Sequence, residues 1–266
     1  KFTCLRENFH QGLSIVTPLA RKATHLPILS NILIKAEMSG ISLISTNLEM
    51  ALQSKVRAKV EEEGSFTFPA QLLFNVISSL SGEKIEGELK NNTLKIVCQN
   101  FRGEVKGMPT EEYPLIPRID QKNPLIIPKE EVVNVLEKVI FAAAKSDPRP
   151  ELNGVLFSFG GSGLALAATD SYRLAKAVIN LEGLPKEERQ IIIPGRTLEE
   201  LMRIINELPS EEKPEVLVFL EENQVMFSFG GVEIVSRLVE GKYPDYQQII
   251  PTAFQTTANV SRSELM

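Results

Sequence analysis

The sequence predicts an α+β protein built from two copies of one domain, each with two helices packed on antiparallel sheet. Three observations predict this fold class: short sequence patterns recur in the same order in both halves of the chain, predicted strands outnumber predicted helices, and short glycine-containing turns join strands. The length of 266 residues and the 43% content of hydrophobic residues are enough for two domains of ordinary size.

The internal repeat is carried by five pairs of segments. Positions 27 and 150 head one pair and are 123 residues apart, and two further pairs share this separation. The separation then grows, as loop insertions would make it. The pairs are residues 4–7 and 127–130, 27–33 and 150–156, 45–47 and 168–170, 66–70 and 191–195, and 112–114 and 242–244. Five correspondences in the same order indicate a duplication.

The repeat also sets the expected domain boundaries. One unit spans about 125 residues, which is close to the usual size of a domain. We therefore expect one domain over residues 1–122 and a second over residues 123–250. Residues 251–266 are expected to be a linker and the start of a third copy, because Val260–Leu265 repeats the order of apolar, capping, basic and acidic residues found at both earlier starts.

Two amphipathic helices are predicted in each repeat. Apolar residues recur at helical spacing after Phe9 and after Leu72 in the first repeat, and after Lys129 and Thr197 in the second. Thr197 with Glu200 matches a capping box, which would place the start of the last helix there.

The strands follow from alternation and from short apolar runs. Alternating apolar and polar side chains predict a half-buried strand over residues 51–60. Apolar runs predict further strands over residues 155–159, 164–168, 216–220 and 224–229. The glycines at positions 160, 161 and 163 lie between two of these strands. A phosphate-binding loop needs a helix after its glycines, so we expect a hairpin turn here instead.

Composition excludes several classes of protein. A net charge of −5 and an isoelectric point near 5.4 argue against binding nucleic acid through overall positive charge, so any such surface must be local. No apolar stretch is long enough for a membrane helix, and we expect a cytoplasmic protein with no membrane partner. Cys4 and Cys98 are isolated in apolar runs and are expected to be buried, with no metal site and no cofactor.

No catalytic constellation stands out. The histidines are His10 and His25, and no nucleophile-elbow motif accompanies them. Thr169 and Asp170 could act as nucleophile and base, but the first repeat has Thr46-Asn47 at the same place, which is typical of a turn that the fold requires. An α+β enzyme that uses Thr169 and Asp170 therefore stays open as an alternative.

Several motifs, in order, resemble the successive signatures of bacterial sliding clamps, the beta subunits of DNA polymerase III. They are Lys1–Thr3, Leu26–Asn31, Thr46–Met50, Leu152–Gly154, Ala168–Leu174 and Gly241–Tyr246. The resemblance implies a repeated DNA-clamp (processivity) fold with three domains per subunit. It also implies a homodimeric ring of six domains around double-stranded DNA, which tethers the replicative polymerase and has no catalytic site. Because such rings close through the third domain, we expect this chain alone to be monomeric.

The resemblance places helices inside the ring, where basic side chains would face DNA. Helical spacing puts Lys138 and Lys145 on one stripe and Arg196 with Arg203 on another, each opposite the apolar face. Weaker candidates at helix ends are Arg21, Lys22 and Arg149. Such a stripe would attract phosphates without reading base sequence.

The family's hydrophobic cleft for partner peptides matches four positions here, Thr169, Leu174, Pro244 and Ile249. Tyr172 stands where the family often has His. The resemblance implies that short linear peptides of the polymerase, the clamp loader and repair proteins bind there, and that a third domain completes the cleft. A duplicated scaffold that binds protein partners but not DNA stays open as a second alternative.

Overall fold

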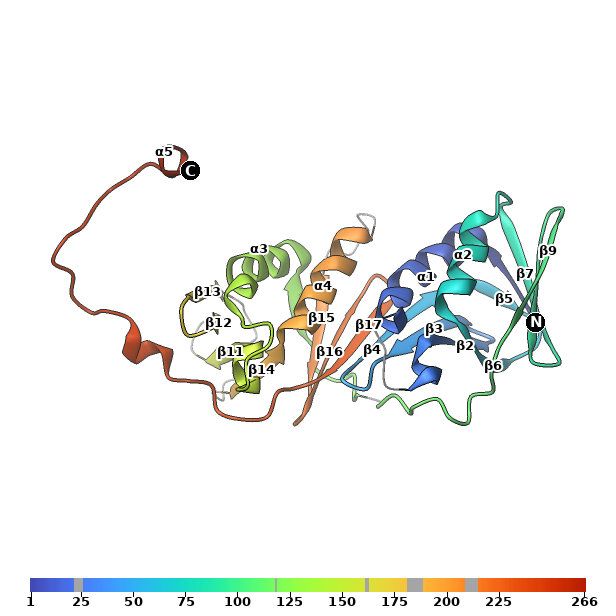
Figure 1. Ribbon diagram of the computed structural model, residues 1–266, viewed down its shortest axis with the longest axis horizontal. Helices are drawn as coiled ribbons and strands as arrows, with labels where there is room; N and C mark the ends of the chain where they lie inside the picture. The colour runs from blue at the N-terminus through green and yellow to red at the C-terminus, as the bar shows by residue number, and fades with distance from the viewer. Residues whose placement is uncertain (22–25, 118, 161–162, 181–188, 209–214) are drawn as a thin grey trace.

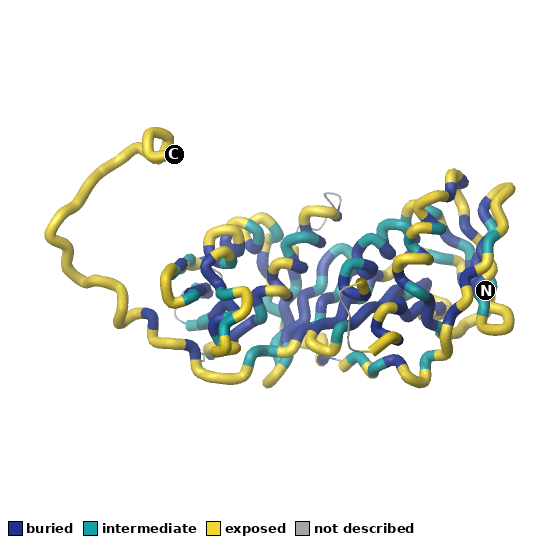
Figure 2. The backbone as a smooth tube through the Cα atoms, viewed as in Figure 1, coloured by how far each residue is buried: buried dark blue, intermediate teal, exposed yellow. Residues whose placement is uncertain are grey.

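The structure is a computed structural model that describes residues 1–21, 26–117, 119–160, 163–180, 189–208 and 215–266. Its two repeats lie side by side along the long axis of the molecule, and the C-terminal segment extends away from the second repeat (Figure 1). Residues 251–266 are exposed throughout, whereas buried residues fill both repeats (Figure 2).

Each repeat contains two main helices and at least eight strands. The elements of the first repeat are β1 (Phe2–Leu5), α1 (Arg6–Arg21), β2 (Asn31–Glu37), β3 (Gly40–Thr46), β4 (Met50–Val56), β5 (Ala58–Val60), β6 (Gly64–Pro69), α2 (Ala70–Ser79), β7 (Lys84–Lys90), β8 (Thr93–Cys98) and β9 (Phe101–Lys106). Those of the second are β10 (Leu125–Pro128), α3 (Lys129–Val139), β11 (Gly154–Gly160), β12 (Gly163–Thr169), β13 (Leu174–Asn180), β14 (Arg189–Pro194), α4 (Gly195–Glu207), β15 (Glu215–Leu220), β16 (Gln224–Phe229) and β17 (Val232–Arg237). Short 3-10 helices lie at Pro27–Ser30, Ile140–Ala142, Pro150–Asn153 and Tyr246–Ile249, and α5 (Arg262–Leu265) ends the chain.

The strand order is the same in both repeats. The first repeat has the orders β1-β7-β8-β9 and β4-β3-β2-β6, and the second has β10-β15-β16-β17 and β13-β12-β11-β14. All neighbouring strands pair antiparallel. The one addition is β5, which continues β4 and pairs with β1. The predicted duplication of one α+β fold is therefore confirmed.

One strand pairing joins the two repeats. β17 of the second repeat pairs antiparallel with β4 of the first, so that two four-stranded sheets become one eight-stranded sheet. An ion pair of 2.8 Å between Lys55 and Glu233 crosses the same joint. α4 lies next to α1 here, and the four main helices lie on one side of the long sheet (Figure 1). The core is continuous across the joint, because buried residues of both repeats belong to one cluster.

Close packing of helix on sheet is visible at Gly12 of α1. A Cβ atom at this position would lie 2.8 Å from Val56 Cγ2 and 2.9 Å from Leu43 Cδ1. Glycine therefore lets α1 approach β3 and β4, while Phe9 and Leu13 on the same helix are fully buried. The sheet thus covers the apolar face that the sequence predicts for this helix.

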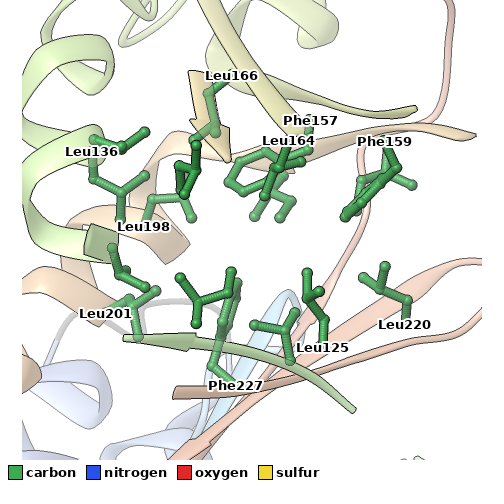
Figure 3. A pocket seen from close by; sticks show the side chains of 17 residues that line it. Leu125, Leu136, Phe157, Phe159, Leu164, Leu166, Leu198, Leu201, Leu220 and Phe227 are labelled. Atoms are coloured by element: carbon green, nitrogen blue, oxygen red, sulfur yellow. The ribbon is translucent and has the colours of Figure 1, made fainter. Parts of the chain in front are cut away.

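The core of the second repeat contains a small cavity, shown in Figure 3. Its volume is about 20 Å³, and only apolar side chains line it, including Leu198 and Leu201 of α4 and Phe227 of β16. A space of this size and polarity stays dry, because a water molecule there would find no hydrogen-bond partner. The cavity is a packing defect between the two sheets and too small for an organic ligand.

Two local expectations about the helices were wrong. α4 begins at Gly195, directly after Pro194, so Thr197 lies inside the first turn and no capping box forms. The Thr197 hydroxyl instead lies 2.7 Å from the Ser236 hydroxyl of β17. α3 ends at Val139 and a 3-10 turn follows it, so Lys145 lies in the next loop and not on the helix.

Other local expectations hold. The predicted hairpin is confirmed, since Gly160 pairs with Gly163 across β11 and β12. Residues 51–60 form β4 and β5 with a break at Arg57. Cys4 and Cys98 are buried and free. In the part of the chain that the structure describes, none of the helices is long and apolar enough to cross a bilayer.

Candidate functional site

The turn between β12 and β13 is where the sequence placed both a possible catalytic pair and part of a partner cleft. The backbone N–H groups of Tyr172 and Arg173 donate to Asp170 Oδ1 at 3.0 and 2.8 Å. The N–H of Ser171 donates to Thr169 Oγ1 at 3.1 Å. Both polar side chains of the pair are thus engaged in closing the turn.

The first repeat contains the same turn. Thr46 Oγ1 accepts from the N–H of Leu48 at 3.1 Å, and Asn47 Oδ1 accepts from the N–H of Met50 at 2.8 Å. The third residue of each turn has a positive φ, 76° at Leu48 and 74° at Ser171. Both repeats need this turn, and its hydrogen bonds account for the presence of Thr169 and Asp170 without a catalytic role.

The charge state of Asp170 follows from these bonds. Hydrogen bonds from the backbone N–H groups of Arg173 and Tyr172, and then the Arg173 guanidinium, lower the pKa of Asp170 to about 2. An acid with this pKa is a poor general base near neutral pH.

Asp170 gives a prediction about acid stability. Its pKa is lower in the folded protein than its ordinary value of 3.8, so its contribution to stability is present above that value and is lost as the pH falls towards about 2. Asp170→Asn copies the amide of Asn47, keeps an acceptor for the turn and removes the titration. We expect the melting temperature of the variant to fall less steeply than that of the parent between about pH 4 and pH 2. Equal slopes in thermal unfolding across this range would contradict the prediction.

A buried tyrosine holds this turn to the rest of the second repeat. The Tyr243 hydroxyl accepts a hydrogen bond of 3.0 Å from the N–H of Thr169. Burial is the main reason that the pKa of Tyr243 is raised. The first repeat has Tyr113 in the corresponding role, with its hydroxyl donating to the Ile44 carbonyl at 3.2 Å. Tyr-Pro appeared in both repeats of the sequence, but only the structure shows what the tyrosine does.

The four cleft positions and Tyr172 have different surroundings. Thr169 is buried, and Leu174 is partly exposed and packs against the cluster that contains Tyr243 and Tyr246. Pro244 is exposed directly after Tyr243. Ile249 ends the 3-10 helix with 66% of its surface exposed, and Tyr172 is 96% exposed. Tyr243 and Tyr246 belong to the buried cluster on which Leu174 packs, and sequence reasoning did not include them among the cleft residues.

The predicted DNA-facing residues do not form one group. Lys138 and Arg196 are exposed on α3 and α4, Lys145 is exposed in the loop after α3, and Arg21 is exposed at the end of α1. Lys22 lies outside the described residues. Arg149 is exposed but pairs with Asp147 at 2.9 Å, and it also donates to the Ser171 hydroxyl at 2.9 Å. Arg149 is therefore tied to the β12–β13 turn.

Arg203 differs most from its expected place on an exposed stripe. Its side chain is 25% exposed and bonds to Glu200 and to Glu207, the latter at 2.6 Å. It also donates to the carbonyl of Ile15 in α1 at 2.9 Å, so that it bridges the two repeats. Burial alone would lower the pKa of Arg203, but its bonds to the two glutamates raise it overall. The charge is neutralised within the protein.

The helices as a group carry almost balanced charge. Six basic residues lie on α1 to α4, namely Arg6, Arg21, Lys129, Lys138, Arg196 and Arg203, against seven glutamates at positions 7, 130, 131, 137, 199, 200 and 207. Neither predicted stripe keeps both of its members, because Lys145 lies off the helix and Arg203 is paired with two glutamates. Of these six, Arg6 pairs with Glu7, and Arg203 pairs with Glu200 and Glu207. Arg21, Lys129, Lys138 and Arg196 have no salt bridge among the residues that the structure describes.

Loss of Arg203 should weaken the joint between the repeats. Arg203→Ala would leave Glu200, which is 7% exposed, without its partner and would remove the bond to α1. We expect the free energy of unfolding to fall by about 1–3 kcal/mol. Arg196→Ala, on the same helix but exposed, should change it by no more than about 0.5 kcal/mol. Denaturant unfolding of both variants measures this, and equal effects would contradict the bridging role.

Comparisons with known proteins agree with this geometry. Residues 1–117 match the model of the DNA polymerase III beta subunit, N-terminal domain, and residues 126–245 match that of its central domain. The chain is 29% identical to the beta sliding clamp of a Synechocystis species and 28% identical to that of Staphylococcus aureus. These alignments cover 100% and 99% of the chain, and 73% and 71% of the two relatives.

Solved structures give the same result. The DNA polymerase III subunit beta from Pseudomonas aeruginosa superposes with a TM-score of 0.88 at 28% identity, over 95% of this chain and 69% of that one. The DNA polymerase sliding clamp from Bacillus subtilis gives the same TM-score and identity over 95% and 68%. Two consecutive domain models and whole-chain similarity in sequence and fold lead to one conclusion: the chain belongs to the family of bacterial DNA polymerase III beta subunits, the sliding clamps.

Proposed function

We propose that this chain encircles double-stranded DNA as part of a sliding clamp and tethers a DNA polymerase to its template. Sliding clamps are processivity factors and not catalytic enzymes. The observation that carries the proposal is the joint between the repeats, where β4 and β17 make one sheet out of two domains and leave the helices on one side.

The same joint can be repeated at both ends of the described structure. β13 is the counterpart of β4, and β9 is the counterpart of β17, and each is an edge strand in its sheet. Unpaired edges offer N–H and C=O groups to a further strand. A ring follows if further domains pair at these edges with the geometry of the β4–β17 joint, and a homodimer with three domains in each subunit would place six domains in the ring.

DNA contact in such a ring would rest on few cations. We propose Lys138, Lys145, Arg196 and Arg21 as phosphate contacts, because all four are exposed, together with Lys22, the next residue in the sequence after Arg21. Arg203 and Arg149 are proposed instead as structural residues, since their charges are paired. Sparse contact with phosphates and none with base edges suits a protein that must move along DNA of any sequence.

Partners would bind at the cleft around Leu174 and Pro244, with Thr169, Ile249 and the exposed ring of Tyr172 at its borders. Leu174 supports this because it is a partly exposed leucine on an apolar floor. Short peptides of polymerases, the clamp loader and repair proteins are the proposed ligands, since few apolar anchors supply most of the energy in such sites.

A topological experiment tests the proposal. The intact protein that carries this chain is loaded by its clamp loader onto nicked circular DNA, which is then linearised. We expect retention on the circle and loss from the linear form, because a ring can leave only over an end. Equal retention on both forms would show ordinary binding, and no retention on either would favour a scaffold that binds protein partners alone.

A further inference from the structure

A groove lies next to the proposed partner cleft, on the face of the second repeat that carries Leu156 and Lys176. It has a volume of about 730 Å³ and runs between the strands β11 to β13 and the segment after Gly241. Pro244 and Tyr243 line it, so the groove and the cleft share a wall. Leu174, Lys176 and Val178 alternate along β13 and face the same side, with Lys176 about 7 Å beyond Leu174.

The groove carries positive charge. Lys176 and Lys242 line it and are both exposed, and neither has a salt bridge within 4 Å among the residues that the structure describes. Lys176 Nζ lies 5.8 Å from the centroid of the Tyr246 ring, which holds the ammonium group over the groove floor. The one acidic side chain in the lining, Asp245, already accepts bonds from Gln247 and Gln248.

The first repeat contains the matching groove without this charge pattern. Leu33, Gln53, Tyr113 and Pro114 line it at positions that correspond to Leu156, Lys176, Tyr243 and Pro244. The register of the strands fixes the match, since Gln53 pairs with Ile44 as Lys176 pairs with Ala167. Lys242 corresponds to Glu112. The two lysines are therefore particular to the second repeat and are not required by the shared fold.

We propose that this groove binds the acidic flank of partner peptides whose apolar residues sit at Leu174 and Pro244. The inference rests on the proposed function, because it extends the same cleft. An extended peptide advances about 3.3 Å per residue. An acidic residue two to four positions from the apolar anchor therefore reaches Lys176 or Lys242. The charge of the peptide next to its apolar anchor thus helps to determine which partners bind.

The test compares two labelled synthetic peptides on the intact protein by fluorescence polarisation. Both contain the same pair of leucines, flanked on either side by glycines that alternate with glutamates in one peptide and with glutamines in the other. We expect the acidic peptide to bind about three- to tenfold more tightly at low salt, and this advantage to fall as salt is added. The double variant Lys176→Gln/Lys242→Gln should bind both peptides equally, with unchanged thermal unfolding.

Lys35→Gln, in the groove of the first repeat, is the matched control and should keep the full advantage of the acidic peptide. Equal affinity of the two peptides for the parent protein overturns the groove proposal while leaving the cleft intact. An advantage that survives the double variant overturns it as well. If neither peptide binds, the cleft itself is wrong, and the proposed partner site fails together with the inference.

Discussion

Leu198→Ala should produce the largest loss of stability among single changes in the second repeat. Leu198 is 0% exposed and lines the cavity of about 20 Å³ in the core. Truncation removes the burial of the side chain and joins the new space to one that is already there. We expect the free energy of unfolding to fall by about 3–5 kcal/mol, since the cost rises with the volume of the cavity left behind.

The duplicated fold supplies a matched control for this change. Leu73 on α2 is the counterpart of Leu198 and is also 0% exposed. Leu73→Ala should cost less, because it does not lie on the cavity. Denaturant unfolding gives the two free energies, and hydrogen exchange assigns each loss to its repeat. A larger loss of unfolding free energy for Leu73→Ala than for Leu198→Ala would show that the cavity does not determine the size of the loss.

Leu174→Asp should abolish most of the binding of partner peptides while leaving the protein folded. An unpaired carboxylate would replace an apolar anchor, and loss of that anchor's burial should weaken binding on the order of ten- to a hundredfold. The fold should tolerate the change because Leu174 is partly exposed and because Ala51 occupies the corresponding position of the first repeat.

Peptide titration against the intact protein, with thermal unfolding alongside, measures both effects. Leu174→Ala serves as the control for size without charge and should be folded, with an intermediate loss of affinity. Unchanged affinity of the aspartate variant would remove Leu174 from the site. Joint loss of binding and folding would mean that Leu174 is a core residue.

The sequence by itself determined the duplication, the fold class and the family. These features can be read from the sequence because each repeat must supply the same apolar faces and the same turns, as Thr46-Asn47 and Thr169-Asp170 show. Helix positions came from the 3.6-residue period and were mostly right. Helix ends were predicted less well. The start of α4 depends on where β14 ends and not on the side chain of Thr197.

Only the tertiary structure decided which charges are free and which surfaces continue into one another. Periodicity puts Arg196 and Arg203 on one face of α4. It cannot show that α1 of the other repeat lies beside Arg203, or that the Ile15 carbonyl accepts a hydrogen bond from the Arg203 guanidinium. Likewise, Lys176 and Lys242 are far apart in sequence and meet in one groove only because the chain returns across β13 after β17. Electrostatic interactions and grooves depend on distances between segments that are remote along the chain, and those distances exist only after folding.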